Sequence, residues 1–280
     1  MSLRPGETGD LLRVNHAMSA MLGRDESELL AARVQDLAHP EDVELVEVTF
    51  AAMTDGTDLA ELVQHRFQHS GGHDVWVDAS YSVITDQAGR PDYAICMVND
   101  VTTRRRAEAE LTYNALHDPL TGLPNRALLT EQLGLALGRA QRSGTTVGVL
   151  YLDLDHFKEV NDSFGHAAGD ALLVDVAARL ASAMRESDTA GRMGGDEFVV
   201  LCEGAASDAD VMATADRVGR ALTIDLDTDG QQLRVSASIG IARSAGADDT
   251  PEDLLRRADV AMYRAKANGR SRYEVSAHDA

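Results

Sequence analysis

Apolar and polar residues alternate with different periods along the chain, which predicts two folded parts joined by a polar helix. In the first part, short helical segments precede stretches in which apolar residues occupy every second position, as in half-buried strands. Helices are expected at 15–23, from 27, and over 40–53 with a stop at 55–56, and strands at 61–67, 75–83 and 93–98. We predict a first domain over 10–103, preceded by a disordered lead-in over 1–9.

A polar helix is predicted over 104–117, between the two parts. Ala107, Leu111 and Ala115 recur every four residues in it and form a narrow apolar stripe among charged positions. Such a stripe suits a short parallel coiled coil with a second copy of the chain. Packing of this helix on one of the two domains is the alternative.

The second part, over 118–276, alternates helices with apolar strands. Helices are expected at 126–142, after 154, and at 170–184, 209–222 and 251–266, and strands at 147–154, 233–242 and 272–275. A hairpin around Asp196 adds antiparallel pairing. This order predicts an α/β (α+β) fold in which helices flank a central sheet, close to the palm of polymerases and nucleotide cyclases.

Composition places the chain among globular proteins, because 280 residues suffice for about two domains and 44% of them are hydrophobic. A net charge of −20 repels nucleic acid and anionic lipid, so no nucleic-acid partner and no membrane contact within this chain are expected. No apolar run reaches the roughly 20 residues of a membrane helix, and no secretory signal is recognised. Cys96 and Cys202 are expected to be buried free thiols, which fits a cytoplasmic location.

Three acidic residues carry the candidate chemistry of the second part. Asp196 and Glu197 stand at the tip of the predicted hairpin, in the segment 194–198 that reads Gly-Gly-Asp-Glu-Phe. Asp153 stands at the end of the strand predicted over 147–154. Adjacent carboxylates on a tight turn repel each other and bury little, but they suit a divalent cation. Together the three are interpreted as a Mg²⁺ site for nucleotidyl transfer.

Only two of the 26 basic residues are lysines, Lys158 and Lys266. A compact ammonium group can approach phosphate oxygens where a planar guanidinium does not fit. Lysine at these two positions, in a chain otherwise biased to arginine, is interpreted as phosphate contact, with chance as the alternative.

The first part resembles a PAS domain. The motifs that carry the resemblance are 39–42 (His-Pro-Glu-Asp), 71–77 (Gly-Gly-His-Asp-Val-Trp-Val) and 99–102 (Asn-Asp-Val-Thr). The resemblance implies a cupped antiparallel sheet with short helices that senses a small ligand or acts as a dimerising relay. Its ligand stays unknown, because the cysteine motif of flavin-binding members is absent. Four histidines could ligate haem but are expected to be exposed or to form turns: His39, His65, His69 and His73.

The second part resembles the GGDEF domain of diguanylate cyclases over its whole length. Five motifs in order carry the resemblance: 118–126 (Asp-Pro-Leu-Thr-Gly-Leu-Pro-Asn-Arg), 153–170, 194–198, 238–242 (Ser-Ile-Gly-Ile-Ala) and 261–270. The resemblance implies that the chain condenses two GTP molecules to cyclic di-GMP and releases pyrophosphate. Because each domain is expected to hold one GTP, it also implies a homodimer whose domains face each other around a twofold axis.

The resemblance also implies roles for the acidic motifs. Mg²⁺ or Mn²⁺ is expected to bind the carboxylates of Asp153, Asp196 and Glu197 and the backbone carbonyl of Leu154. Asp196 is expected to help deprotonate the attacking 3′-hydroxyl. The catalytic residues implied are therefore Asp196, Glu197 and, on the phosphate, Lys158.

Substrate binding is implied for five positions. Asn161 and Asp170 are expected to read guanine, because a carboxylate accepts from N1–H and the 2-amino group, which adenine lacks. Lys158, Lys266 and Arg270 are expected to neutralise the triphosphate. The substrate predicted in this way is GTP.

Arg185 and Asp188 match the inhibitory RxxD motif of the family, which binds the product away from the active centre. The product would then act as a feedback inhibitor, with a second arginine from the next helix, Arg217 or Arg220. Arg192 is open either to phosphate contact or to solvation at a strand end, and Asp155 to a structural role such as capping the following helix.

Two other functions stay open at this point. One is a non-catalytic receptor that binds cyclic di-GMP through Arg185 and Asp188, against which the intact acids of the two motifs argue. The other is a related cyclase with mixed or adenine specificity, against which Asp170 argues.

Overall fold

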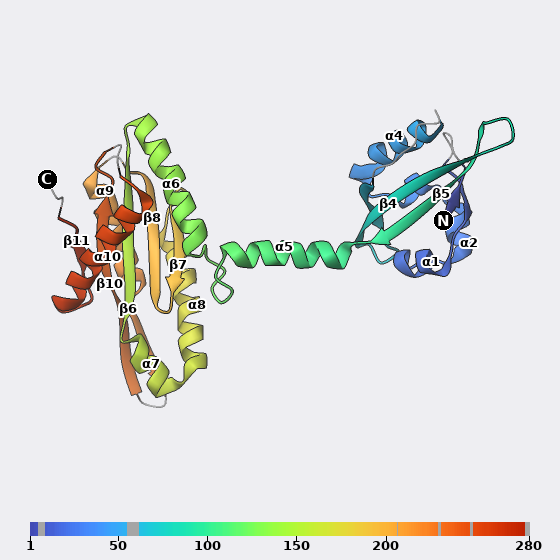
Figure 1. Ribbon diagram of the computed structural model, residues 1–280. Coiled ribbons are helices and arrows are strands. Elements are labelled where there is room, and N and C mark those ends of the chain that lie inside the picture. Colours follow the sequence, from blue (N-terminus) through green and yellow to red (C-terminus); the bar gives the residue numbers. More distant parts are fainter. Residues whose placement is uncertain (5–8, 55–61, 206, 229–230, 247–248, 278–280) are drawn as a thin grey trace. The chain divides into compact units, whose positions relative to one another are not determined.

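The computed structural model describes residues 1–4, 9–54, 62–205, 207–228, 231–246 and 249–277. It divides into two compact units, 1–111 and 112–280, and each is described by itself. The predicted fold class is confirmed: an antiparallel sheet with short helices comes first, and a helix-flanked mixed sheet follows (Figure 1). In these described ranges, no helix combines the length and apolar character needed to cross a bilayer.

Two helices of the first unit begin at side chains that satisfy free backbone amides. Asn15 caps the first helix, and Asp25 caps the second in a reciprocal capping box with Glu28. The helices are α1 (His16–Leu22), α2 (Glu26–Ala31), α3 (Val34–Leu37), a 3₁₀ turn (Pro40–Asp42) and α4 (Val43–Thr54). They match the predicted segments except for α3, which was not predicted as a separate helix, while the predicted stop at 55–56 lies outside the described residues.

Five antiparallel strands form the sheet of the first unit, in the order β2-β1-β5-β4-β3. They are β1 (Ser2–Leu3), β2 (Leu11–Arg13), β3 (Val63–Gln68), β4 (Asp74–Thr85) and β5 (Pro91–Asp100). Alternate residues such as Val77, Ala79 and Ala94 are buried against the helices. Ile95 and Met97 of β5 are exposed on the other face.

The prediction of a disordered lead-in is wrong for the first residues of the chain. Ser2–Leu3 form β1, which pairs with β5 and β2, and the side chain of Leu3 is fully buried. The terminal amine of Met1 donates to the carbonyl of Cys96. A two-residue strand is too short to show an alternating pattern, so its tertiary pairing decides its structure. Residues 5–8 of this prediction lie outside the described residues.

The expectation for the four histidines holds for three of them. His39 caps the 3₁₀ turn, and His69 stacks on His73 at the turn between β3 and β4. His65 contradicts it, because its ring is buried in the core and packs edge-on against Phe67. Desolvation by burial lowers the pKa of His65. Its place on the inner face of β3 follows from strand alternation, which buries it with Phe67.

The polar helix is α5 (Thr102–Leu116), and none of its residues is buried. Its apolar stripe is exposed, and Leu111 keeps 69% of its surface accessible. At its start, Arg104 pairs with Asp78 and Arg105 lies 3.9 Å above the ring of Trp76. The helix is therefore joined to the first unit by its basic residues, and the stripe expected to form a coiled coil is left uncovered.

The second unit is built on a mixed sheet in the order β11-β10-β6-β8-β7, with β9 paired to β10. The strands are β6 (Thr146–Asp155), β7 (Thr189–Gly194), β8 (Glu197–Ala205), β9 (Ile224–Thr228), β10 (Gln231–Arg243) and β11 (Tyr273–Val275). The helices are α6 (Arg126–Ser143), α7 (Phe157–Phe164), α8 (His166–Ala183), α9 (Asp208–Ala221) and α10 (Pro251–Ala267). Strand β9 was not predicted, and α8 begins four residues before the predicted start.

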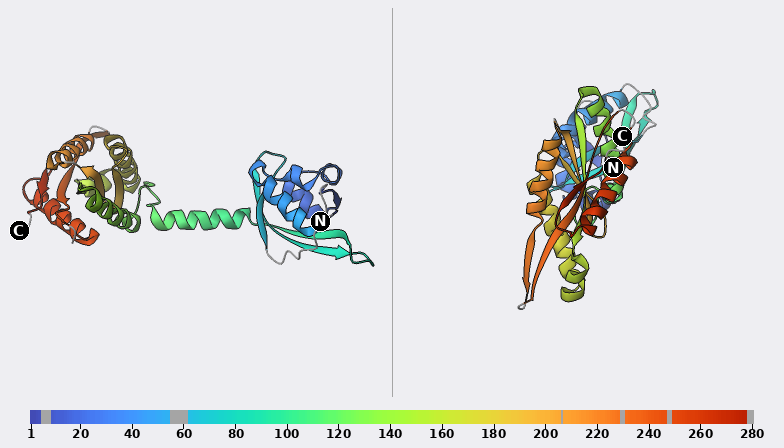
Figure 2. Two further views of the ribbon diagram at one scale, coloured as in Figure 1. Left: turned by 90° about the horizontal axis from the view of Figure 1, so that it is seen from above. Right: turned by 90° about the vertical axis from the view of Figure 1, so that its left-hand side faces the viewer.

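Helices cover both faces of this sheet (Figures 1 and 2). Leu150, Leu152 and Leu154 of β6 pack against α8 and α9, whereas Val149 and Tyr151 pack against α6 and α10. The central strand is therefore apolar along its length, and polar residues appear only at its end. The functional candidates lie at this end.

Candidate active site

The end of β6 meets the turn between β7 and β8. Asp153 pairs in register with Glu197, and the amide of Leu154 donates to the carbonyl of Asp196 at 3.2 Å. Gly194 and Gly195 have positive φ values of 138° and 54°, which a side chain would disfavour. The glycines thus allow a turn tight enough to place Asp196 against the end of β6.

A cavity of about 540 Å³ opens at this point. Its lining joins residues of three motifs, and the predicted site residues among them are Asp153, Leu154, Lys158, Asp196, Lys266 and Arg270. Two of the predicted metal-binding carboxylates and three basic side chains therefore share one cavity, which Asp155, Glu159 and Asp162 also line. Such a set can hold a polyphosphate together with a cation.

Asp153 is a buried acid of this cavity. Burial raises the pKa of Asp153 to about 6, and the nearby charges of Asp196 and Glu197 act in the same direction. Lys266 opposes the shift, since its Nζ lies 2.5 Å from Oδ2 of Asp153. Burial and like charges disfavour the ionised form of this carboxyl group, and a cation bound beside it would favour that form.

Glu197 lies apart from Asp196 although the two are adjacent in sequence. The hydroxyl of Tyr151 donates to Oε2 of Glu197 at 2.9 Å, and both line a neighbouring cavity beside α6 and α10. Within the described ranges, no three acidic, histidine or cysteine side chains are grouped as a ready metal site. The four predicted ligands are thus close but not assembled.

The donor set nevertheless fits a hard divalent cation. All four groups offer oxygen, which Mg²⁺ and Mn²⁺ prefer, and the carboxylates are near enough to raise the pKa of Asp153. Lys266 and Tyr151 hold two of these carboxylates. Each contact involves one carboxylate oxygen, Oδ2 of Asp153 and Oε2 of Glu197.

Asn161 and Asp170 lie at the junction of α7 and α8 and outside the lining of the cavity. A Cβ built on Gly169 would lie 2.0 Å from Oδ1 of Asn161, so only glycine leaves room for this amide. Asp170 follows Gly169 directly and is exposed. The two predicted guanine readers therefore lie on consecutive helices, and Asn161 shares α7 with Lys158.

Arg192 is largely buried and lies outside the lining of the cavity, so solvation at a strand end does not describe it, while contact with phosphate stays a prediction. Its side chain is only 10% exposed and donates to the carbonyl of Gly195 at 2.7 and 3.0 Å. It also donates to Asp118 at 2.8 Å. Arg192 thus connects the motif at 118–126 to the glycine turn, a contact between distant segments that no local pattern signals.

Family comparison identifies this arrangement. The sequence profile described as "Diguanylate cyclase, GGDEF domain" matches residues 115–272, which is more than half of the chain. The chain belongs to the GGDEF family. A second profile, described as "PAS fold", matches residues 11–98, and the first unit has that fold. Proteins of the GGDEF diguanylate cyclase family generally use divalent metal ions, which agrees with the oxygen ligands gathered here.

Several relatives are named diguanylate cyclases. Diguanylate cyclase TpbB of Pseudomonas aeruginosa is 45% identical over 163 residues, 58% of this chain and 38% of that protein. Response regulator PleD of Caulobacter vibrioides is 44% identical over 162 residues, 56% of this chain and 35% of that protein. The chain thus spans between a quarter and two fifths of the length of three curated relatives that it matches.

Solved structures agree with the GGDEF fold of the second unit. A structure of the GGDEF domain of TpbB from Pseudomonas aeruginosa has a TM-score of 0.54 and 43% identity, covering 57% of this chain and 94% of that one. The coiled coil and GGDEF domain of DgcB from Caulobacter crescentus, in complex with c-di-GMP, has a TM-score of 0.56 and 27% identity. The latter covers 62% of this chain and 93% of that one.

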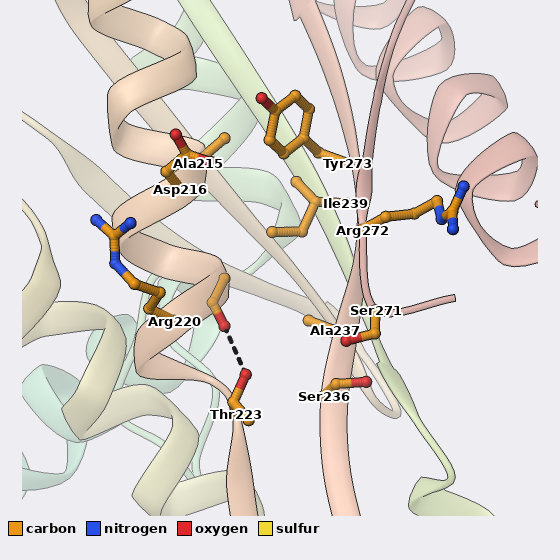
Figure 3. Close-up of a pocket in the computed structure, with 11 residues that line it drawn as sticks. Ala215, Asp216, Arg220, Thr223, Ser236, Ala237, Ile239, Ser271, Arg272 and Tyr273 are labelled. Atoms are coloured by element: carbon orange, nitrogen blue, oxygen red, sulfur yellow. Dashed lines mark hydrogen bonds between the residues drawn. The ribbon is translucent and has the colours of Figure 1, made fainter. Parts of the chain in front are cut away.

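The predicted inhibitory motif of this GGDEF domain lies between α8 and β7. Asp188 accepts from the amide of Arg185 at 3.1 Å, and its carboxylate is almost fully buried while Arg185 is exposed. Arg217 of α9 lies 3.8 Å from Asp188, whereas Arg220 is among the residues that line another cavity (Figure 3). The structure therefore favours Arg217 as the second arginine of this cluster.

Asp155 does not cap the following helix. His156 stands at the start of α7 without a side-chain cap, and Asp155 instead accepts hydrogen bonds from Ser236, Ser238 and the amide of Ser271. Asp155 therefore has a structural role, as expected, but it connects three segments of the chain and does not cap a helix. Cys96 and Cys202 are buried free thiols, as expected.

Proposed function

We propose that this chain is a diguanylate cyclase, which joins two GTP molecules into cyclic di-GMP and releases two pyrophosphates. The observation that carries the proposal is the single cavity that combines the carboxylates of Asp153 and Asp196 with three basic side chains: Lys158, Lys266 and Arg270. The names of TpbB and of other relatives support the same activity.

In this proposal the acids hold a divalent ion and the bases hold the phosphates. Mg²⁺ or Mn²⁺ is held by Asp153, Asp196, Glu197 and the carbonyl of Leu154, and it supplies charge stabilisation at the phosphate. Lys158, Lys266 and Arg270 neutralise the triphosphate. Asp196 accepts the proton of the 3′-hydroxyl that attacks the α-phosphorus.

Asn161 and Asp170 bind the guanine ring in this proposal. An amide can donate to O6, and a carboxylate can accept from N1–H and the 2-amino group. Asn161 is held against Gly169, and Asp170 stands next to that glycine with its side chain exposed. This arrangement supports GTP over ATP as the substrate.

The active species in this proposal is a homodimer. One domain offers one set of phosphate and base ligands, while closing two phosphodiester bonds needs two GTP molecules facing each other. The exposed stripe of α5, with Leu111 at its centre, supports a parallel coiled coil between two copies. The DgcB structure, which contains a coiled coil beside its GGDEF domain, supports the same reading.

Two forms of regulation belong to the proposal. The PAS unit sets how the two cyclase domains meet through α5, in response to a ligand whose identity stays unknown. Cyclic di-GMP inhibits by binding Arg185, Asp188 and Arg217, whose clustering supports an anion-binding and guanine-binding surface. We place this activity in the cytoplasm, where GTP is available and the free thiols of Cys96 and Cys202 stay reduced.

The test is to incubate the purified protein with GTP and Mg²⁺ and to identify the nucleotides by mass. Wild type is expected to form cyclic di-GMP and Asp196→Ala to form none. Asp175→Ala, which removes an exposed acid of α8 paired only with Arg179 at the surface, serves as the matched control and keeps activity. Product binding without turnover, unchanged by Asp196→Ala, would instead support a receptor, and mixed products from GTP with ATP would overturn the substrate assignment.

A further inference from the structure

The turn that carries Arg270 has an unfavourable backbone conformation. Gly269, Arg270 and Ser271 follow each other with φ values of 111°, 59° and 50°. Within the described ranges, the only other non-glycine residue with positive φ is His156, at 66°. Left-handed conformations of ordinary residues persist only where surrounding contacts hold them, and they concentrate at functional sites.

Asp155 lies next to all three non-glycine residues with positive φ, which are His156, Arg270 and Ser271. His156 follows it in sequence, and the amide of Ser271 donates to its Oδ2 at 3.1 Å. Nε of Arg270 lies 3.9 Å from its Oδ1. One buried carboxylate therefore stands at the centre of the strained backbone.

Asp155 is itself held in place by β10. Ser236 donates to Oδ2 and Ser238 to Oδ1, both at 2.7 Å, and the carboxylate has no exposed surface. In the antiparallel pairing of β6 with β10, Ser236 stands directly opposite Asp155. With the Ser271 amide, three donors satisfy this charge, so its position is well determined.

Packing alone does not support the turn. Ser271 is exposed, and together with Ser236 it lines a cavity of about 470 Å³ bounded by α9, β10 and β11 (Figure 3). Asp155 lines the active-site cavity, as Arg270 does. The hydrogen bond from the Ser271 amide to Asp155 thus joins the turn to the sheet at a place where neighbouring side chains leave space.

We propose that Asp155 is a positioning residue that holds Arg270 at the triphosphate by fixing the Gly269–Ser271 turn. The inference rests on the proposed function in one respect, namely that Arg270 contacts phosphate. Asp155 itself contacts no substrate in this account. Its effect passes through the Ser271 amide, since the guanidinium of Arg270 is more than half exposed and an ion pair there contributes little.

The test compares three variants by their KM for GTP and their kcat. Arg270→Ala is expected to raise KM about tenfold through loss of a charged phosphate contact, and Asp155→Ala to do the same with a much smaller change in kcat. Asp155→Asn is the matched rescue. Its amide oxygen can accept from Ser271 and Ser236, and its NH₂ can donate to the Ser238 hydroxyl, so KM should stay within about twofold of wild type.

Two further measurements separate positioning from a general structural role. Asp155→Ala should weaken binding of a non-hydrolysable GTP analogue but leave GMP affinity unchanged, because the base readers lie on α7 and α8. In the double variant Asp155→Ala/Arg270→Ala, KM should equal that of Arg270→Ala alone. Additive increases in KM in the double variant would overturn the inference. So would a loss of GMP affinity in Asp155→Ala as large as its loss of affinity for the GTP analogue.

The outcomes also distinguish this inference from the proposed function. If Arg270→Ala leaves binding of the GTP analogue unchanged, the phosphate role of Arg270 is wrong. If Arg270→Ala weakens binding and Asp155→Ala does not, the positioning role alone is wrong. Should Asp155→Ala fail to fold, hydrogen exchange of the wild-type protein still decides: the exposed Ser271 amide should be protected, and exchange at the rate of an unstructured amide contradicts the inference.

Discussion

Each unit contains a cluster of acidic and basic residues, and the two clusters shift the pKa of an aspartate in opposite directions. In the first unit, Arg66 binds Asp42 through three hydrogen bonds of 2.7 to 2.9 Å and Glu41 through one. These bonds lower the pKa of Asp42 to about 2, the side-chain bond to Arg66 being the main cause. In the active-site cavity the opposite holds, since burial and neighbouring acids raise the pKa of Asp153 despite Lys266.

The difference separates a cluster that stabilises the fold from one prepared for a ligand. The ionised form of Asp42 gains more free energy from its contacts with Arg66 than it loses by leaving water. The ionised form of Asp153 loses more free energy by burial and by like charges than it gains from Lys266, and an added cation or a proton would offset that loss. Substitutions should therefore act on stability in the first cluster and on catalysis in the second, and four predictions test this contrast from the largest effect to the smallest.

The largest effect is expected for Glu197→Ala. Loss of one proposed metal ligand should lower kcat at least about a thousandfold. The thermal unfolding midpoint should change little, because Glu197 is bound only by the hydroxyl of Tyr151 among its side-chain contacts in the described residues. Cyclic di-GMP formation and differential scanning calorimetry measure the two quantities. Tyr151→Phe, which frees Glu197 without removing it, is the matched control and should stay active, so a loss as large as that of Glu197→Ala contradicts the ligand role.

A smaller effect is expected for Arg192→Ala. This change removes the donors that hold the carbonyl of Gly195 and connect it to Asp118. The glycine turn should loosen, so kcat should fall about tenfold to a hundredfold while KM for GTP stays nearly constant. Steady-state kinetics gives both constants. Arg179→Ala removes an exposed arginine of α8 and should leave kcat unchanged; equal values for the two variants would argue against a role of Arg192 in the turn.

Gly169→Ala should act on the base and not on the phosphates. The new methyl group would meet Oδ1 of Asn161 and displace this amide. We expect KM for GTP to rise about tenfold and GMP affinity to fall in parallel, with loss of one hydrogen bond to the base as the cause. Calorimetric titration with GMP is the measurement. Unchanged GMP binding would show that Asn161 does not contact guanine.

The smallest effect is expected for Asp42→Asn in the first unit. Because the pKa of Asp42 is lowered in the folded state, its ion pair stabilises the fold above the ordinary aspartate range and is lost as pH falls from about 4 to about 2. At neutral pH the substitution should cost about 1 kcal/mol of unfolding free energy, after allowance for solvent screening of the pair. The loss should disappear near pH 2, and kcat should not change. Denaturant unfolding at both pH values provides the check, and a loss that is constant with pH contradicts the ion-pair account.

Much of this protein could be derived from the residues alone. Apolar periodicity predicted the helices of both units and the strands β4, β5, β6 and β10, because each is long enough to repeat its pattern. The glycines at 194 and 195 predicted the tight turn, and the acids beside them a cation site. The resemblance to GGDEF domains then supplied roles for Asn161, Asp170 and Lys158, which remain predictions.

Tertiary structure decided the rest, because the partners involved are distant in sequence. Nothing near Arg192 points to Asp118, 74 residues away, and nothing near Asp155 points to Ser271, 116 residues away. Strand β1 exists only through its pairing with β5, and His65 is buried only because its face of β3 meets the helices. Local sequence determines which conformations and charges a segment can offer. Long-range pairing determines how those charges are satisfied, and in this chain it gives Asp155 three hydrogen-bond donors, whereas Asp153 pairs with Lys266 beside two other acids.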